Sequence, residues 1–235
     1  YEDLVKNPFD TIEYDFKVAK MVAERVSKSG SDGKLLWDKN DGVLHVNFTE
    51  KILAAVLAKL SNFIPETGIW MNTQRPEWND ANNALVGNGV SMVTLYYLRR
   101  MSSFCIELFR EATMEHMELS EEISGFYEQI NKALIEFEPL LSGELTDKNR
   151  RAVTDALGTA GSSYREKIYR DGFSGKKETV TGGELAEFFA IALKHIDHAI
   201  RKNKRQDNLY HAYNLISFNK DEVSIRYLYE MLEGQ

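Results

Sequence analysis

The sequence predicts an all-α protein built from helical hairpins. Three observations favour this class: apolar residues recur at helical spacing along most of the chain, only four of 235 residues are proline, and the alternation typical of strands is scarce. With 43% hydrophobic and 28% charged residues, the composition suits one helical domain over residues 1–235 with a buried core. The chain begins at Tyr1 rather than Met, and we expect it to be a fragment of a larger protein.

A stretch rich in Gly and Asp separates the first two predicted helices. Residues 11–28 place their apolar side chains on one helical face, whereas residues 29–46 are rich in Gly and Asp and predict only short extended pieces. Asn47, followed three residues later by Glu50, is typical of a helix start, and it predicts a helix over residues 47–63.

The rest of the chain continues this pattern. An acidic and aromatic loop is expected at residues 66–89 and a polar loop at 171–183, and residues 210–216 suit either a strand or a helix. Further helices are predicted over residues 90–117, 120–139, 146–170, 184–202 and 219–232.

Charge and cysteine content exclude several classes. With 29 basic and 36 acidic residues the net charge is -7, which argues against non-specific binding to nucleic acid. Cys105 is the single cysteine and cannot form an internal disulfide, and we expect it to be a small buried apolar residue. No apolar run is long enough for a membrane span, and no signal peptide is visible, so a cytoplasmic location is favoured.

The spacing of His195 and His198 permits a metal site. A solvated pair is the favoured interpretation, and no metal or cofactor is predicted.

One run of the predicted loop is unusually dense in chemically useful groups. Between Arg75 and Asn83 the chain offers two carboxylates, three carboxamides, one guanidinium and one indole. An indole needs a packing partner, and clustered carboxylates repel one another unless a partner or a proton reduces their charge. A sugar meets both needs, because its ring face stacks on an indole and its hydroxyls pair with acids and amides. A solvated loop is the alternative.

The segment Glu77-Trp78-Asn79-Asp80-Ala81-Asn82-Asn83 resembles the Asp-Trp-Asn-Asp-Gly-Met-Asn signature of cellobiose and chitobiose phosphorylases. Those enzymes belong to the six-hairpin glycosidase superfamily, which is built on an (α/α)6 toroid. The resemblance implies that Asp80 is the general acid and that Trp78 lines the sugar site. Glu77 and Ala81 depart from the signature. A complete toroid has twelve helices and about seven long ones are predicted, so we expect a part or a shortened relative of it.

Each of the remaining candidate site residues has a structural interpretation beside the functional one. We expect Glu77 to be the second catalytic candidate, although a surface ion pair with Arg75 is an alternative for both residues. Trp70 and Trp37 are candidate walls of the sugar site, and a core position is the alternative for Trp70. The full set of expected substrate-binding residues is Trp78, Asn79, Asn82, Asn83, Arg75, Trp70 and Trp37, with capping of the next helix as the alternative for Asn82 and Asn83.

These residues predict a carbohydrate-active enzyme that cleaves a glycosidic bond, as a glycoside hydrolase or a glycoside phosphorylase. Its partner would be an oligosaccharide, with inorganic phosphate as the alternative to water as acceptor. Two other functions stay open: a catalytically silent sugar-binding domain, and a helical module that binds a protein through its acidic loop. The oligomeric state is not predicted.

Overall fold

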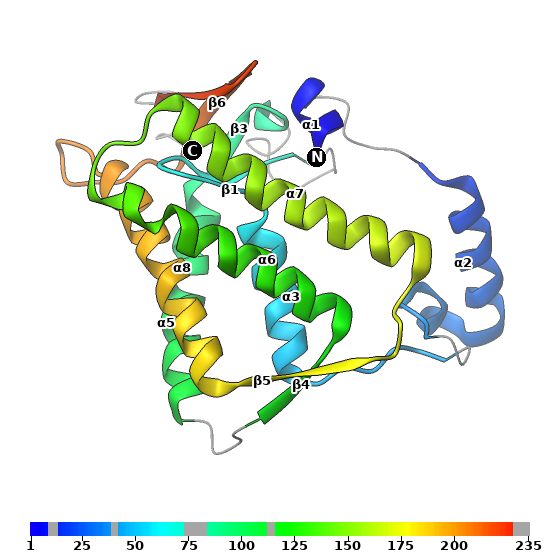
Figure 1. Ribbon diagram of the computed structural model, residues 1–235. Coiled ribbons are helices and arrows are strands. Elements are labelled where there is room, and N and C mark those ends of the chain that lie inside the picture. Colours follow the sequence, from blue (N-terminus) through cyan, green and yellow to red (C-terminus); the bar gives the residue numbers. More distant parts are fainter. Residues whose placement is uncertain (9–13, 39–41, 73–83, 112–115, 228–235) are drawn as a thin grey trace.

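The protein has a mixed α/β fold, so the prediction of an all-α toroid is wrong. The computed structural model describes residues 1–8, 14–38, 42–72, 84–111 and 116–227. These residues form a five-stranded antiparallel sheet in the order β1-β2-β3-β6-β7 and a two-stranded sheet of β4 and β5. Helices still make up the larger part of the structure (Figure 1).

Most of the predicted helices are present. The helices are α1 (Glu2–Lys6), α2 (Phe16–Ser29), α3 (Phe48–Leu60), α5 (Met92–Glu111), α6 (Glu121–Phe137), α7 (Asp147–Asp171) and α8 (Gly182–Lys202), with 3-10 turns η1 (Gly30–Lys34) and η2 (Glu138–Ser142). The helix predicted over residues 219–232 is wrong, because the end of β6 (Tyr213–Asn219), a two-residue turn and β7 (Glu222–Tyr227) occupy its described part.

Local hydrogen bonds explain why these helices begin where they do. The Asn47 carboxamide accepts from the backbone N–H of Glu50 at 2.8 Å, as its spacing predicts. α7 and α8 each begin with a capping box, in which Thr146 pairs with Asn149 and Thr181 pairs with Glu184. These bonds satisfy N–H groups that have no partner within the helix.

Residues 210–216, which suit either a strand or a helix by sequence, overlap a strand, whereas the other strands were missed because most of them carry no alternating pattern. The strands are β1 (Phe63–Ile64), β2 (Gly68–Trp70), β3 (Gly89–Ser91), β4 (His116–Ser120), β5 (Lys177–Thr181), β6 (Tyr213–Asn219) and β7 (Glu222–Tyr227). Every residue of β1, β2 and β3 is buried, so their two faces do not differ in polarity. In β7, Val223, Ile225 and Tyr227 do alternate with polar residues, and this period of two is a usable signal.

The register of the sheet brings two connections to one end. Trp70 pairs with Val90 at the end of β2, and Gly89 at the start of β3 pairs with Leu215 of β6. β6 then continues past Leu215 into the two-residue turn before β7. The connection between β2 and β3 and the β6–β7 turn therefore lie at the same end of the sheet.

Two apolar clusters pack on the two faces of this sheet. The larger one joins Phe63 and Ile69 to buried side chains of α3, α5, α6, α7 and α8, and α5 lies beside α8 (Figure 1). The smaller cluster consists of Ile64, Trp70, Val90, Ile216 and Val223, with Tyr1, Leu4, Val5 and Phe218 packed against it. α1 thus covers the face of the sheet opposite the main core.

Candidate functional site at one end of the sheet

The predicted catalytic segment, Arg75 to Asn83, lies entirely outside the described residues. This applies to Arg75, Glu77, Trp78, Asn79, Asp80, Asn82 and Asn83. The structure describes the two ends of this connection, which join it to β2 and β3. These ends define where the segment is attached.

Hydrogen bonds tie the two ends of the connection to each other. The backbone N–H of Met71 donates to the carbonyl of Gly89 at 2.9 Å, and the N–H of Gly87 donates to the carbonyl of Met71 at 2.7 Å. One residue further on, the Asn72 carboxamide donates to Asn62 Oδ1 at 2.7 Å. The strand pairing thus extends beyond β2 and β3 to the point where the motif-bearing segment departs.

Trp70, a sequence candidate for a sugar-stacking wall, is a core residue. Only 4% of it is exposed, and its ring packs on Phe218 with 4.9 Å between ring centroids. Its indole Nε1 donates to the carbonyl of Gly87 at 2.9 Å. The ring therefore presents no free face to a ligand, and it bonds instead to the end of the motif-bearing connection.

Trp37 lies in a different part of the molecule. Its indole Nε1 donates to the carbonyl of Asp32 at 3.0 Å, and the Arg25 guanidinium sits 4.9 Å from the ring centroid. These contacts hold it against α2 and η1, which stand at the edge of the molecule, apart from the five-stranded sheet (Figure 1). The structure does not bring Trp37 and Trp70 together.

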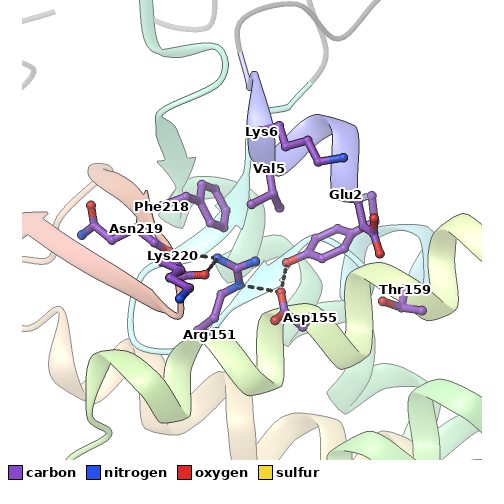
Figure 2. A pocket seen from close by; sticks show the side chains of 10 residues that line it. Glu2, Val5, Lys6, Arg151, Asp155, Thr159, Phe218, Asn219 and Lys220 are labelled. Carbon is purple, nitrogen blue, oxygen red and sulfur yellow. Dashed lines mark hydrogen bonds and ion pairs between the residues drawn. The ribbon is translucent and has the colours of Figure 1, made fainter.

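A cavity of about 510 Å³ opens at the same end of the sheet, between α1, α7 and the β6–β7 turn. Figure 2 shows the side chains that line it. They are Tyr1, Glu2, Val5, Lys6, Arg151, Asp155, Thr159, Phe218, Asn219 and Lys220. The cavity thus combines two aromatic rings with charged groups of both signs. A volume between about 300 and 1,000 Å³ is usual for small-molecule sites.

Arg151 organises the wall of this cavity. Its Nε donates to Asp155 Oδ1 at 2.6 Å, and its Nη1 donates to the carbonyls of Asn219 and Lys220 at 3.1 and 3.3 Å. The guanidinium also lies 5.7 Å from the centre of the Phe218 ring. One side chain on α7 thereby fixes the β6–β7 turn (Figure 2).

Asp155 is held from two sides. Besides Arg151, the Tyr1 hydroxyl donates to its Oδ1 at 2.6 Å. Burial, together with the adjacent Asp155 carboxylate, raises the pKa of Tyr1 well above its ordinary value of 10. The phenol is therefore a hydrogen-bond donor throughout the physiological range. For the cluster of Tyr1, Arg151 and Asp155, the sequence contains one signal. Arg151 and Asp155 are four residues apart on a helix, a spacing that brings two side chains together.

The cavity and the motif-bearing connection meet through two aromatic rings. Phe218 lines the cavity and packs on Trp70, and Trp70 bonds to Gly87 at the end of the connection. Both rings belong to the apolar cluster on the α1 face of the sheet. These two rings thus stand between the cavity and Gly87 at the end of the connection.

A second polar cluster is buried beneath the sheet. Arg150 Nη2 lies 2.7 Å from Glu66 Oε2, and His198 Nε2 lies 3.2 Å from Glu66 Oε1. No side chain of the three is more than 7% exposed. Asn203 donates to the carbonyl of Glu66, and Asn214 donates to Asn203 Oδ1. Apart from Asn214 Oδ1, which has no hydrogen-bond partner among the described residues, these groups satisfy one another away from solvent, and we assign them a structural role.

The two histidines are buried, so the interpretation as a solvated pair is wrong. His195 is 2% exposed and bonds the carbonyl of Leu134 at 2.8 Å, whereas His198 contacts Glu66. Burial lowers the pKa of His195. Across the described ranges, no group of three or more His, Cys, Asp or Glu side chains could hold a metal ion. No helix within those ranges is long and apolar enough to cross a membrane.

A scan against protein-family models and a search of curated proteins gave no match to this chain.

Proposed function

We propose that this protein cleaves a glycosidic bond, by hydrolysis or phosphorolysis, with Asp80 as the general acid. The observation that carries the proposal is the Trp78-Asn79-Asp80 run, flanked by Glu77 and two asparagines, in the connection between β2 and β3. Its resemblance to the phosphorylase signature supports an acid role for Asp80.

Each residue type in the run suits one part of this reaction. Asp80 would protonate the glycosidic oxygen as the bond breaks, and water or phosphate would attack the opposite face of the sugar. The Trp78 ring would stack on a sugar face and partly desolvate the acid, which favours the protonated form. Asn79, Asn82 and Asn83 would bind hydroxyl groups without adding charge. Glu77 is the alternative acid, with Arg75 as its ion-pair partner.

The cavity beside the connection supports a sugar-sized ligand. Its volume of about 510 Å³ lies within the usual range for small-molecule sites. Asp155, Thr159 and Asn219 supply acceptors and donors suited to hydroxyl groups. This cavity also supports a second candidate function, a sugar-binding domain without catalysis, because binding there needs no contribution from Asp80.

The test is the substitution Asp80→Asn in the protein of natural length. We expect the turnover of a cleaved disaccharide to fall about 100-fold or more, because positioned proton transfer contributes about 10²–10⁴ in rate. Sugar affinity should change little, since the amide keeps the shape of the carboxyl group. A panel of disaccharides, assayed with and without phosphate, provides the substrate and identifies the acceptor.

The matched control is Asp221→Asn, which makes the same chemical change in the exposed β6–β7 turn. Its turnover should equal that of the unmodified protein. Unchanged turnover in Asp80→Asn would move the acid role to Glu77. Sugar binding without cleavage of any disaccharide in the panel would favour the silent binding domain.

A further inference from the structure

One side of α5 carries a row of apolar side chains that reaches solvent. Tyr97, Met101, Phe104 and Leu108 follow one another at intervals of four, three and four residues, which is the spacing of the contact residues in a pair of coiled helices. Tyr97 is 64% exposed and Phe104 is 53% exposed, whereas Met101 and Leu108 are partly buried against the main core. These four residues, the α5 row, lie on a helix at one edge of the molecule (Figure 1).

The α5 row is distinct from the side of the helix that the core uses. Each of its residues directly precedes a buried residue of α5, namely Leu98, Ser102, Cys105 and Phe109. One residue along a helix corresponds to about 100° around its axis. α5 therefore has a second apolar side, next to the buried one. An exposed apolar surface of this kind marks a site of interaction more often than a chance grouping does.

Two exposed charges of opposite sign flank the α5 row on the same side. Arg100 and Glu107 are seven residues apart, which places them about 10 Å from each other along the helix axis, too far for an ion pair. Arg99, by contrast, pairs with Asp197. Among the described residues, neither Arg100 nor Glu107 makes an ion pair or a side-chain hydrogen bond.

A second copy of α5, packed antiparallel, satisfies both the row and its charges. Tyr97 then lies opposite Leu108 of the partner subunit, and Met101 lies opposite Phe104 of the partner subunit. In this register Arg100 comes beside Glu107 of the partner subunit, and two-fold symmetry repeats the same contact in the other direction. A parallel pair would instead place each charge level with its own copy, which is unfavourable.

We propose that this protein forms a two-fold symmetric dimer in which the α5 row packs antiparallel against the α5 row of a second copy. The self-complementary charges support a second copy as the occupant, because an unrelated protein or a membrane surface would not require opposite charges at this spacing. The proposal does not depend on the cleavage of a glycosidic bond. It concerns a surface of α5 that the candidate site does not use.

The experiment measures the dissociation constant of the dimer by sedimentation equilibrium of the protein of natural length. Arg100→Glu and Glu107→Arg each turn both symmetric contacts into like-charge contacts. We expect each variant to raise the Kd about tenfold or more at low salt. An equimolar mixture of the two variants should recover the original affinity, because both contacts of the mixed dimer again join opposite charges. The double variant Arg100→Glu with Glu107→Arg should recover it too.

Two further variants separate the surface from general effects on charge and folding. Glu128→Arg makes the same charge change as Glu107→Arg at an exposed position of α6, and its Kd should equal that of the unmodified protein. Phe104→Ala should raise the Kd about tenfold or more, because large aromatic side chains dominate such contacts. The Tm measured at a concentration well below the Kd should stay within about 2 °C in all of these variants, since the changed side chains are exposed.

The outcomes decide the proposal in either direction. A protein that stays monomeric up to about 100 μM overturns it. So does a dimer whose Kd ignores Arg100→Glu and Glu107→Arg, because its contact then lies elsewhere. Weakening by both single variants without recovery in their mixture overturns the antiparallel register. Weakening that the mixture and the double variant both reverse supports the dimer as described, whether or not the protein proves to be a glycosidase.

Discussion

Glu66 combines two costly features at one residue. Its backbone φ is +63°, which non-glycine residues rarely adopt, and its carboxylate is buried at a tight turn between β1 and β2. Both costs are offset by bonds to Arg150, His198 and the backbone N–H of Leu145. Arg150 also donates to the carbonyls of Pro65 and Val223. Arg150 therefore joins α7 to the β1–β2 turn and to β7.

At the residue scale, stability should depend on the ionisation of Glu66. Burial alone would raise the pKa of its carboxyl, but the bonds from Arg150 and His198 outweigh burial and hold that pKa below its ordinary value of 4.5. A carboxyl whose pKa is lower when folded stabilises the protein above the unfolded pKa. This contribution is lost as the pH falls from about 4.5 through the folded pKa. Urea unfolding between pH 7 and pH 3 measures it.

Glu66→Gln should remove about 3 kcal/mol at pH 7, since breaking a buried ion pair leaves one charge uncompensated. It should also flatten the acid limb of the stability curve. Glu144→Gln, at a side chain that is 90% exposed, makes the same charge change as a control and should keep that limb. An acid limb of equal slope in both variants would show that another group controls acid unfolding.

At the element scale, helices and strands differ in how far local sequence determines them. α3, α7 and α8 start at side chains that cap their own first turns, so the signal lies within four residues. β1, β2 and β3 have two or three residues each, and β3 pairs with a strand 126 residues further along the chain, as Gly89 with Leu215 shows. No local pattern encodes that pairing. β7 was missed for another reason, because Asn219 resembles a helix cap and outweighed a genuine alternation.

The capping box of α8 yields the element-scale prediction. The Thr181 hydroxyl accepts from the Glu184 N–H and also bonds the Glu184 carboxylate. Thr181→Ala should destabilise the protein by about 1 kcal/mol, and Thr181→Ser should recover most of that loss. Thr179→Ala, on an exposed position of the same strand β5, is the control and should have a smaller effect. Denaturant midpoints at constant m-value provide the measurement.

At the scale of the whole molecule, one sheet ties the two apolar clusters together. β1, β2 and β3 come from the first half of the chain, and β6 and β7 come from its end. Each cluster packs on one face of these strands, and Arg150 crosses from α7 to β7. Loss of either cluster would expose a face of the same sheet. The two clusters should therefore unfold together.

This coupling can be tested with Trp70 as a reporter. Trp37→Phe with Trp78→Phe leaves Trp70 as the single tryptophan, since the chain contains three. Its fluorescence then follows the smaller cluster, while far-UV circular dichroism follows the helices. The two thermal midpoints should agree within about 2 °C if unfolding is two-state. An earlier fluorescence midpoint would mean that the α1 face of the sheet opens on its own.

The candidate site was only partly accessible from the sequence. The motif around Asp80 is contiguous, so it is visible by inspection. The cavity is lined by three segments, near Tyr1, Arg151 and Phe218, whose meeting depends on the pairing of β3 with β6. Trp70 was considered as a wall for a sugar, and its buried position and its hydrogen bond to the Gly87 carbonyl appear only in the structure.

The backbone hydrogen bonds at the two ends of the β2–β3 connection limit what a change in the connection can disturb. Because Met71 bonds to both Gly87 and Gly89, the two exits of the intervening segment stay together whatever lies between them. Insertions, deletions or exchange of residues 73–83 should therefore leave the pairing of β2 with β3 in place. A library restricted to those positions would vary the sequence of the connection on one unchanged framework.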